Sequence, residues 1–366
     1  MPLAAVIAGP NSPVELREVP TPTLERDSAI LKVEFSEVCG TDVYLQQGLL
    51  AGVPYPLVPG HVSVGRLEKI FGVINDVHGR PFREGDRVTF LDVHRTCNAC
   101  WYCLVAKATT RCPNRKVYGI TYGLADGPAG GWAEEIYIKP GTRCIGLNSD
   151  PETFIAGGCA LPTALHAIER SNIDFGSVVL VLGAGPVGLN AIMVALLSGA
   201  RRVLCIGAPE LRLNAAAEAG ASDTLNFEEQ TEQSRLEWVR ERTDGRGADI
   251  TIEATGDPSA VVEAMRFTRD AGRVVIVGQY TDHGPVPPEK GFNPHLDLNR
   301  KHLDVRGCWG SDFSHFYRAV ELVADPKHGA PWVGLRSKLT HYSLAEANKA
   351  LNDVAQGKVI KAVIAL

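Results

Sequence analysis

Four cysteines lie close together in the first third of the chain, in the run TCNACWYCLVAKATTRC. Four thiolates at this spacing can surround one zinc ion in a tetrahedron, and they leave no position open for a substrate. The flanking residues are too polar for four free thiols in a hydrophobic core. We therefore predict a closed, structural zinc site, against the alternatives of an iron–sulfur cluster or a redox switch. Its ligands would be Cys97, Cys100, Cys103 and Cys112.

A second set of metal-binding residue types is dispersed along the chain. Cys39 and Asp42 lie in VCGTD, His61 lies in VPGHV, and Cys159 lies in GGCALP. Taken singly, a cysteine is more often a small buried hydrophobe, and a histidine a hydrogen-bonded polar residue. Together, two thiolates and one imidazole form a three-ligand set that leaves a fourth position for water or substrate. Asp42 is suited to orient one of these ligands from behind.

A glycine-rich turn, GAGPVG at 183–188, directly follows the apolar run VVLVL and opens a helical pattern. In this context Gly183 would make the tight turn, Gly185 would let a pyrophosphate approach, and Gly188 would let the helix pack on the strand. The helix N-terminus would offer its free N–H groups to the anion. A structural turn without a ligand is the alternative. The predicted cofactor-binding residues of this turn are Gly183, Gly185, Pro186, Val187 and Gly188.

The residue that reads the adenosine ribose is usually an acid at the end of the second strand. Here that strand, VLCIG, ends in Gly207. Without a carboxylate there, a 2′-phosphate is not repelled, and Arg212 could attract it. Glu210 could instead accept hydrogen bonds from the ribose hydroxyls. The sequence therefore predicts NAD(P) as the cofactor, with a slight preference for NAD.

These residues must be positioned by two kinds of structure. Up to about residue 150, short β-branched runs alternate with glycine and proline, which indicates a mainly antiparallel, barrel-like region. From about residue 160, strands alternate with helices, which predicts a parallel sheet covered on both faces. An amphipathic helix over 313–324, another over 343–356 and a closing strand then follow. We predict an α/β protein with a β-rich domain at 1–160 and 310–366, a zinc lobe at 95–115, and a doubly wound domain at 161–309.

Composition excludes several other classes of protein. The 366 residues are 45% hydrophobic and 22% charged, which is ordinary for a folded globular chain. The net charge of −5 offers no basic field for nucleic acid or anionic lipid. The uncharged segment 177–200 is long enough to cross a bilayer, but its central glycines and proline favour a buried strand–turn–helix unit. Nine cysteines, an odd number, and no secretory signal argue against disulfides and for a cytoplasmic location.

In their order along the whole chain, these motifs resemble the zinc-containing alcohol dehydrogenases of the medium-chain dehydrogenase/reductase superfamily. The resemblance rests on CGTD near 40, GH at 60–61, the four-cysteine lobe, GC at 158–159, GAGPVG, EATG at 253–256 and the closing GKVIKAVIAL. It implies a GroES-like β-rich catalytic domain, a Rossmann cofactor domain, and homodimers or homotetramers. It also implies two zinc ions per subunit, with the catalytic ion on Cys39, His61 and Cys159.

The resemblance places Thr41 next to the bound alcohol and Lys361 near the cofactor pyrophosphate. Two positions depart from the family pattern. Val62 stands where family members usually carry a glutamate after the ligand histidine, and Tyr44 stands where a histidine often ends the proton relay. Without that glutamate, we expect Lys361 to be free for the pyrophosphate alone. The residues expected around the reacting alcohol are Thr41, Asp42 and Tyr44.

The expected function is a zinc-dependent transfer of hydride between an alcohol and NAD(P). Residues 45–57 and Trp309 are apolar and expected to face the pocket, which favours a secondary or cyclic apolar alcohol. One alternative is a zinc-free quinone or enoyl reductase of the same superfamily, which would have no reason to keep the three dispersed ligands. Another is a non-catalytic dinucleotide-binding sensor, to which Val62 and Tyr44 give slight support.

Overall fold

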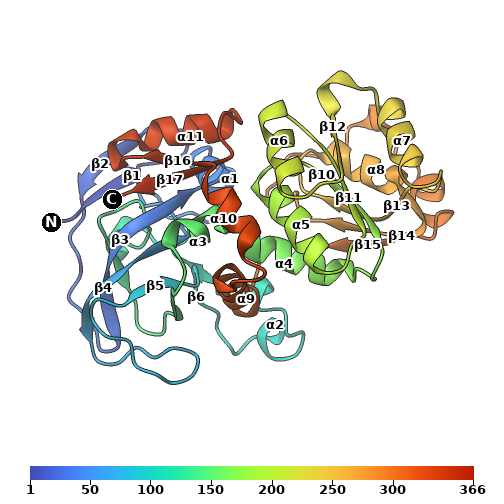
Figure 1. Cartoon of the computed structure of the whole chain (residues 1–366). Helices are drawn as coiled ribbons and strands as arrows, with labels where there is room; N and C mark the ends of the chain where they lie inside the picture. The colour runs from blue at the N-terminus through green and yellow to red at the C-terminus, as the bar shows by residue number, and fades with distance from the viewer. The chain divides into compact units, whose positions relative to one another are not determined.

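The computed structural model describes residues 1–366 and divides into two compact units. The first, here called the β-rich unit, comprises Met1–Gly158 and Asp312–Leu366, and the second, the parallel-sheet unit, comprises Cys159–Ser311. Both ends of the chain lie in the β-rich unit (Figure 1). The C-terminal segment therefore returns to the unit in which the chain began.

The β-rich unit is built around a seven-stranded sheet whose long strand β3 pairs with three others. The eleven residues of β3 contact β4, β8 and β17, all antiparallel, while β16 pairs with β17 in parallel. The strands of this sheet are β3 (Ser28–Val38), β4 (Ser63–Phe71), β5 (Arg87–Phe90), β8 (Glu135–Ile138), β9 (Cys144–Gly146), β16 (Leu339–Tyr342) and β17 (Lys361–Ala365). Two small sheets pair β1 (Leu3–Ile7) with β2 (Val14–Glu18) and β6 (Val93–Arg95) with β7 (Lys116–Val117).

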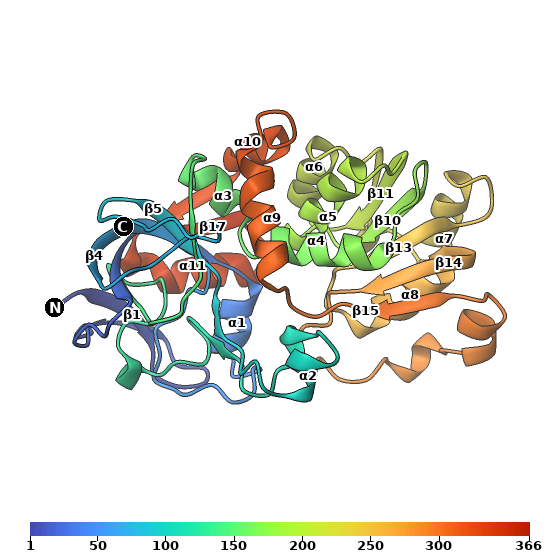
Figure 2. The same cartoon turned by 90° about the horizontal axis from the view of Figure 1, so that it is seen from below.

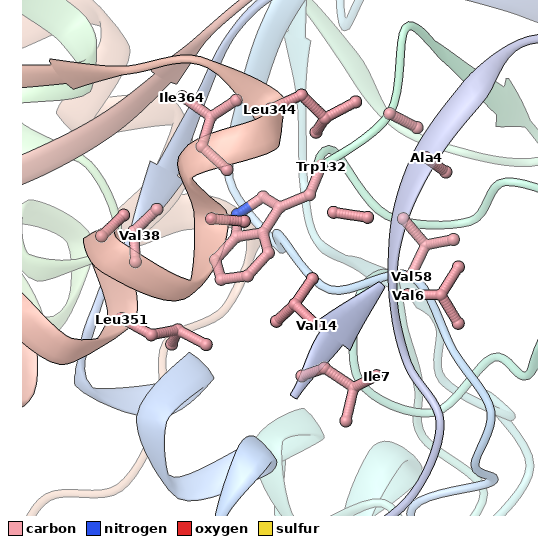
Figure 3. Packing of buried hydrophobic residues seen from close by; sticks show 14 of the residues in the cluster. Ala4, Val6, Ile7, Val14, Val38, Val58, Trp132, Leu344, Leu351 and Ile364 are labelled. Atoms are coloured by element: carbon pink, nitrogen blue, oxygen red, sulfur yellow. The ribbon is translucent and has the colours of Figure 1, made fainter. Parts of the chain in front are cut away.

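A hydrophobic core joins the two ends of the chain to the end of β3. Trp132 is fully buried at its centre, among side chains of β1, β3 and the C-terminal elements (Figure 3). Its indole N–H donates to the carbonyl oxygen of Glu37 at 3.0 Å. A buried tryptophan contributes a large apolar area and finds a partner for its one polar atom. This core fixes the point where β3 ends and the first helix begins.

Six helices belong to the β-rich unit. The helix α9 has the bounds expected from the sequence, whereas α11 is shorter than expected because a 3₁₀ turn precedes it. Figure 2 shows α9, α10 and α11 in the C-terminal part of the chain, coloured orange to red. The helices are α1 (Gly40–Gln46), α2 (Trp101–Leu104), α3 (Pro151–Gly157), α9 (Phe313–Ala324), α10 (Ala330–Arg336) and α11 (Ala347–Ala355).

The parallel-sheet unit holds six strands in the order β12-β11-β10-β13-β14-β15, all parallel. Helices lie on both sides of the sheet (Figure 1), which confirms the predicted fold class. The strands are β10 (Val178–Leu182), β11 (Arg202–Gly207), β12 (Asp223–Asn226), β13 (Ala248–Glu253), β14 (Thr268–Ile276) and β15 (Asp304–Gly307). The helices are α4 (Ala160–Ser171), α5 (Pro186–Leu197), α6 (Glu210–Glu218), α7 (Glu232–Glu241) and α8 (Pro258–Phe267).

The apolar segment 177–200 contributes the interior strand β10 to this sheet, followed by the helix α5. Every residue of β10 is buried, as expected for a strand covered on both faces, and the glycine turn leads into α5, which is 12 residues long. The structure has no helix with the length and apolar character needed to cross a bilayer.

Candidate metal and cofactor sites

The first metal-ligand candidate, Cys39, lies at the junction of β3 and α1. It is the N-cap of α1, and its backbone N–H donates to Asp42 Oδ2 at 2.9 Å. This arrangement is half of a capping box, in which a side chain at the third helical position returns to the N-cap. The cap fixes the backbone from which the Cys39 thiol projects.

His61 is buried and lies close to both Cys39 and Asp42. Its Nε2 lies 3.8 Å from Cys39 Sγ, and its Nδ1 lies 3.7 Å from Asp42 Oδ1. Nδ1 and Oδ1 are buried and have no hydrogen-bond partner. Metal-bound histidines usually direct the second ring nitrogen toward a carboxylate, and this orientation is the one that the structure shows.

Cys159 completes the group. It directly follows Gly158, so the peptide bond itself ties it to the β-rich unit, and its Sγ lies within 4.8 Å of the ligand atoms of Cys39 and His61. Zinc bonds of about 2.3 Å to sulfur and about 2.0 Å to nitrogen place these atoms about 3.6 Å apart in a tetrahedron. The 3.8 Å between Cys39 Sγ and His61 Nε2 fits that value. The three residues therefore fit a zinc ion.

The electrostatics of the group also favour a cation. Burial acts to lower the pKa of His61, but the Cys39 thiolate and the Asp42 carboxylate outweigh it and hold the pKa well above 6.5. Negative charge is thus concentrated around a buried imidazole. A metal ion would neutralise the thiolates and take the place of a proton on Nε2.

The four-cysteine lobe brings its sulfur atoms together in the same way. All four lie within 4.8 Å of one another, and the pairs Cys100–Cys103 and Cys97–Cys112 are each 3.5 Å apart. Two thiolates on one zinc are about 3.8 Å apart in a tetrahedron. No cysteine of the chain forms a disulfide. The donor set fits a closed zinc site.

Two further predicted site residues, Thr41 and Tyr44, lie on α1 beside the ligand cysteine. Tyr44 is half-buried, and burial followed by the nearby Cys39 thiolate raises the pKa of its hydroxyl. Thr41 is half-buried on the first turn of the same helix. The structure thus brings both residues near the metal group, and their part in a proton relay stays a prediction.

The glycine turn has the geometry that a dinucleotide needs. Gly183 has φ +104°, and a Cβ added there would lie 2.7 Å from the carbonyl oxygen of Ala254. A Cβ at Gly188 would lie 1.8 Å from the carbonyl oxygen of Gly183. At Gly185, the N-cap of α5, a Cβ would have no atom within 4 Å. The first two glycines are therefore required by packing, whereas Gly185 leaves open space in front of the helix, whose first residues are Pro186 and Val187.

The end of β11 explains why no acid stands at the ribose position. A Cβ at Gly207 would lie 2.7 Å from Cβ and 2.8 Å from N of Ala184 in the glycine turn. Glu210 is exposed at the start of α6. Arg212 is half-buried, its Nε is buried without a hydrogen-bond partner, and burial lowers the pKa of its guanidinium. The Nε of Arg212, near the end of β11, therefore has no carboxylate partner.

Lys361 has a different partner from the one expected. Its ammonium is 2% exposed and forms an ion pair with Glu37, which is 1% exposed. The expectation that Lys361 is free for the pyrophosphate alone is wrong for this reason. Our sequence reasoning missed Glu37, although a signal was present: an acid near the end of a strand, two residues before the ligand candidate Cys39.

The apolar stretch 45–57 only partly matches its expected place. Leu45 and Leu57 are fully buried in the core around Trp132. Their side chains therefore do not line a substrate pocket. Leu49 is 43% exposed. Trp309 stacks on Tyr280 within the parallel-sheet unit, with ring centres 5.3 Å apart.

Known proteins share both units and their order along the chain. Residues 25–149 match the alcohol dehydrogenase GroES-like domain, and residues 186–325 match the zinc-binding dehydrogenase family. The 5-exo-hydroxycamphor dehydrogenase of Pseudomonas putida is 33% identical over 99% of this chain and 98% of its own. An alcohol dehydrogenase from Thermotoga maritima has a TM-score of 0.92 at 32% identity, over 100% of this chain and 99% of that one. A Sinorhizobium meliloti protein described as a zinc-binding dehydrogenase, bound to NADP, has a TM-score of 0.84 at 26% identity, over 100% and 99%.

Proposed function

The chain belongs to the zinc-dependent alcohol dehydrogenases of the medium-chain dehydrogenase/reductase superfamily, and we propose that it oxidises a secondary or cyclic apolar alcohol with NAD(P). In this proposal each subunit holds two zinc ions. The catalytic ion is bound by Cys39, His61 and Cys159, and the structural ion by the four cysteines of the lobe.

One observation carries the catalytic assignment: three dispersed residues present two sulfur atoms and one imidazole nitrogen within 4.8 Å of one another. Three protein ligands leave a tetrahedral position for the substrate oxygen. When bound there, zinc polarises an alcohol oxygen as a Lewis acid, and the nicotinamide accepts the hydride. A zinc-free reductase or a dinucleotide sensor would have no use for this group.

The chain's own residues orient the metal ligands and carry the alcohol proton away. Asp42 fixes Cys39 through its backbone N–H and faces Nδ1 of His61, so it holds two of the three ligands in place. Thr41 is the residue proposed to receive the alcohol proton. The raised pKa of Tyr44 keeps its hydroxyl protonated at neutral pH, so it can relay a proton outward without holding a charge.

For the cofactor we propose that both nicotinamide dinucleotides are used. The open space at Gly185 supports a pyrophosphate at the start of α5. The packing at Gly207 keeps out the acid that would repel a 2′-phosphate, and Arg212 supplies a cation nearby on α6. These two features reduce the preference for NAD that the sequence suggested.

The substrate class rests on the relative that acts on 5-exo-hydroxycamphor, a bicyclic secondary alcohol, which is 33% identical over 99% of this chain. The test is the formation of reduced cofactor with a panel of alcohols, using the wild-type protein and the Cys39→Ser variant. We expect cyclic secondary alcohols to give the highest kcat/KM, and the variant to lose at least about 1,000-fold because a ligand of the Lewis acid is lost. Faster oxidation of a sugar polyol, or full activity of the variant, would contradict the proposal.

A further inference from the structure

The Glu37–Lys361 ion pair lies deep in the β-rich unit and is not explained by the proposed chemistry. In the antiparallel pairing of β3 and β17, Glu37 is opposite Val363, so Lys361 is its diagonal neighbour on the same face. The two side chains are 1% and 2% exposed. A buried ion pair contributes little net stability, because desolvating both charges offsets their attraction. Net stability therefore does not account for this pair.

Both charged groups press against the backbone of Gly158. A Cβ added to Gly158 would lie 2.1 Å from Glu37 Oε2 and 2.5 Å from Lys361 Nζ. Gly158 has φ +51° and ends α3, where its N–H donates to the carbonyl oxygen of Phe154 at 2.9 Å. The next residue is Cys159. The ion pair thus packs against the turn at Gly158, directly before the ligand candidate Cys159.

Glu37 is also tied to the neighbours of the other two ligands. It lies two residues before Cys39 on β3, and its N–H donates to the carbonyl oxygen of Val62 at 3.0 Å. Val62 directly follows His61. Glu37 therefore contacts the residues next to His61 and Cys159 and lies on the same strand just before Cys39. It contacts Val62 through its backbone and Gly158 through its carboxylate.

The same contacts relate Glu37 to the missing glutamate at position 62. Ser36 is opposite Ser63 in the pairing of β3 and β4, and their hydroxyls are 3.1 Å apart, so opposite residues share a face. Continuing the register places Glu37 opposite Val62. A buried carboxylate therefore stands across the strand pair from the position that lacks one.

We propose that Glu37, held by Lys361, is a positioning residue for the catalytic zinc site. The pair fixes the turn at Gly158, and through it the distance of Cys159 from Cys39 and His61. This inference rests on the proposed function, because it requires zinc on these three residues. It assigns a role to a residue that touches neither substrate nor metal.

The test removes both charges together, so that neither is left alone in the core. In Glu37→Gln/Lys361→Met the side chains keep nearly the same size. We expect the variant to bind the zinc ion of Cys39, His61 and Cys159 about 10- to 100-fold more weakly. This is the effect of removing other groups that orient metal ligands. Zinc affinity is measured by competition with a chromophoric chelator. In cobalt-substituted protein, the visible absorption of the same site should shift, while that of the four-cysteine site stays unchanged.

A control removes another buried ion pair, in which the carboxylate of Glu263 also contacts Lys290 Nζ at 2.9 Å. Arg235 Nη2 and Glu263 Oε1 lie 2.6 Å apart in the parallel-sheet unit, with side chains 10% and 11% exposed. Arg235→Met/Glu263→Gln should lower Tm and leave both zinc affinities unchanged. If the first double variant is obtained only unfolded, Glu37→Asp keeps the charge and draws the carboxylate back from Gly158. It should weaken the same zinc ion by a smaller factor.

Unchanged affinity and unchanged cobalt absorption in both Glu37 variants would overturn the inference, whatever happens to Tm. Failure of the proposed function looks different. In that case the wild-type protein itself would carry one zinc ion, and Cys39→Ser would not reduce the number.

Discussion

At the scale of single residues, Asp42 uses its two carboxylate oxygens for different tasks. Oδ2 accepts the N–H of Cys39 and caps α1, while Oδ1 lies 3.7 Å from Nδ1 of His61. The first contact shapes the backbone, and the second would orient and polarise the imidazole once His61 binds zinc, which is the role proposed for it. Replacing Asp42 by asparagine separates these two tasks, because asparagine keeps one oxygen for the cap and loses the negative charge.

We expect Asp42→Asn to fold with a Tm close to that of the wild-type protein and to bind the catalytic zinc about 10- to 100-fold more weakly. Asp42→Ala removes the cap as well and should in addition lose about 1 kcal/mol of stability. Chelator competition and thermal unfolding measure the two effects. Equal zinc affinities in Asp42→Asn and the wild-type protein would show that His61 is oriented by its packing alone.

Arg212 is placed to distinguish NADP from NAD. Its guanidinium lies on α6 beyond a strand end that has no acid, and its Nε is buried without a hydrogen-bond partner. If it binds the 2′-phosphate, Arg212→Ala should raise the KM for NADP about 10-fold or more and change the KM for NAD much less, since a charged hydrogen bond contributes about 1.5–3 kcal/mol. Initial rates with each cofactor measure this. Arg201→Ala, which removes an exposed arginine beside β11, is the control, and equal losses for both cofactors would argue against phosphate binding.

Single residues also show where sequence reasoning reached its limit. The ligand candidates were predictable because cysteine and histidine are rare residue types beside glycine turns, and the structure places Cys39, His61 and Cys159 together. The ion pair of Glu37 and Lys361 was not, because it depends on the register between two strands that are more than 300 residues apart. No local pattern contains that register.

At the scale of elements, the C-terminal end of α8 is capped by a lysine from a later turn, Lys301. Lys301 Nζ donates to the carbonyl oxygens of Met265, Arg266 and Thr268 at 2.7, 3.0 and 2.5 Å. The last carbonyls of a helix have no partner within it, so this ammonium satisfies groups that would otherwise be left unpaired. Burial lowers the pKa of Lys301 to about 8, so the side chain is still mostly charged at neutral pH.

We expect Lys301→Met to lower the free energy of unfolding by about 1–2 kcal/mol at neutral pH, because the carbonyls lose their donor. The difference in free energy of unfolding between the wild-type protein and this variant should grow with pH. Since the folded pKa of about 8 lies below the unfolded value of about 10.4, the folded lysine releases its proton first, and the wild-type protein gains stability between these two pH values. Denaturant unfolding at several pH values measures the difference. Arg300→Met, next to it and exposed, should show neither effect, and a difference that is constant with pH would contradict the lowered pKa.

Elements with a continuous apolar run or a clear helical period were predictable, although the 12-residue helix α4 was not foreseen. The strand β10 and the helix α9 have the bounds expected from apolar runs and helical spacing. The helices α3 and α10 were not foreseen, because seven residues give fewer than two full periods of any helical pattern. The helix α7 was missed because its residues are mostly polar, with Val239 its only fully buried apolar side chain.

At the scale of the whole molecule, the chain leaves the β-rich unit at Gly158 and returns to it at Asp312. Alternation of strands and helices predicted the parallel sheet, and the change of pattern after about residue 310 predicted that the chain returns to the β-rich part. The pairing of β17 with both β16 and β3 was not predictable. The edge of a sheet is chosen by packing between distant segments, here around Trp132 (Figure 3).

The last prediction concerns the whole metal content of the molecule. Elemental analysis of protein purified without chelators should give about two zinc ions per chain, one in each cysteine-containing group. Cys39→Ser should reduce this to about one and leave Tm nearly unchanged, because Cys39 lies next to a well-packed core. Cys100→Ser should also give about one, with a markedly lower Tm.

The two losses differ because the lobe has little structure apart from its metal. Between Thr96 and Arg115 it contains only the four-residue α2 and one 3₁₀ turn, and the side chains of Trp101, Leu104 and Val105 are 62%, 53% and 62% exposed. With so little buried apolar area, the free energy of zinc binding to four thiolates is itself folding free energy. Excess chelator should therefore first abolish activity, when the three-ligand site is emptied, and only later lower Tm. Simultaneous loss of activity and Tm, or a Tm of Cys100→Ser equal to that of the wild-type protein, would show that the lobe folds without its ion.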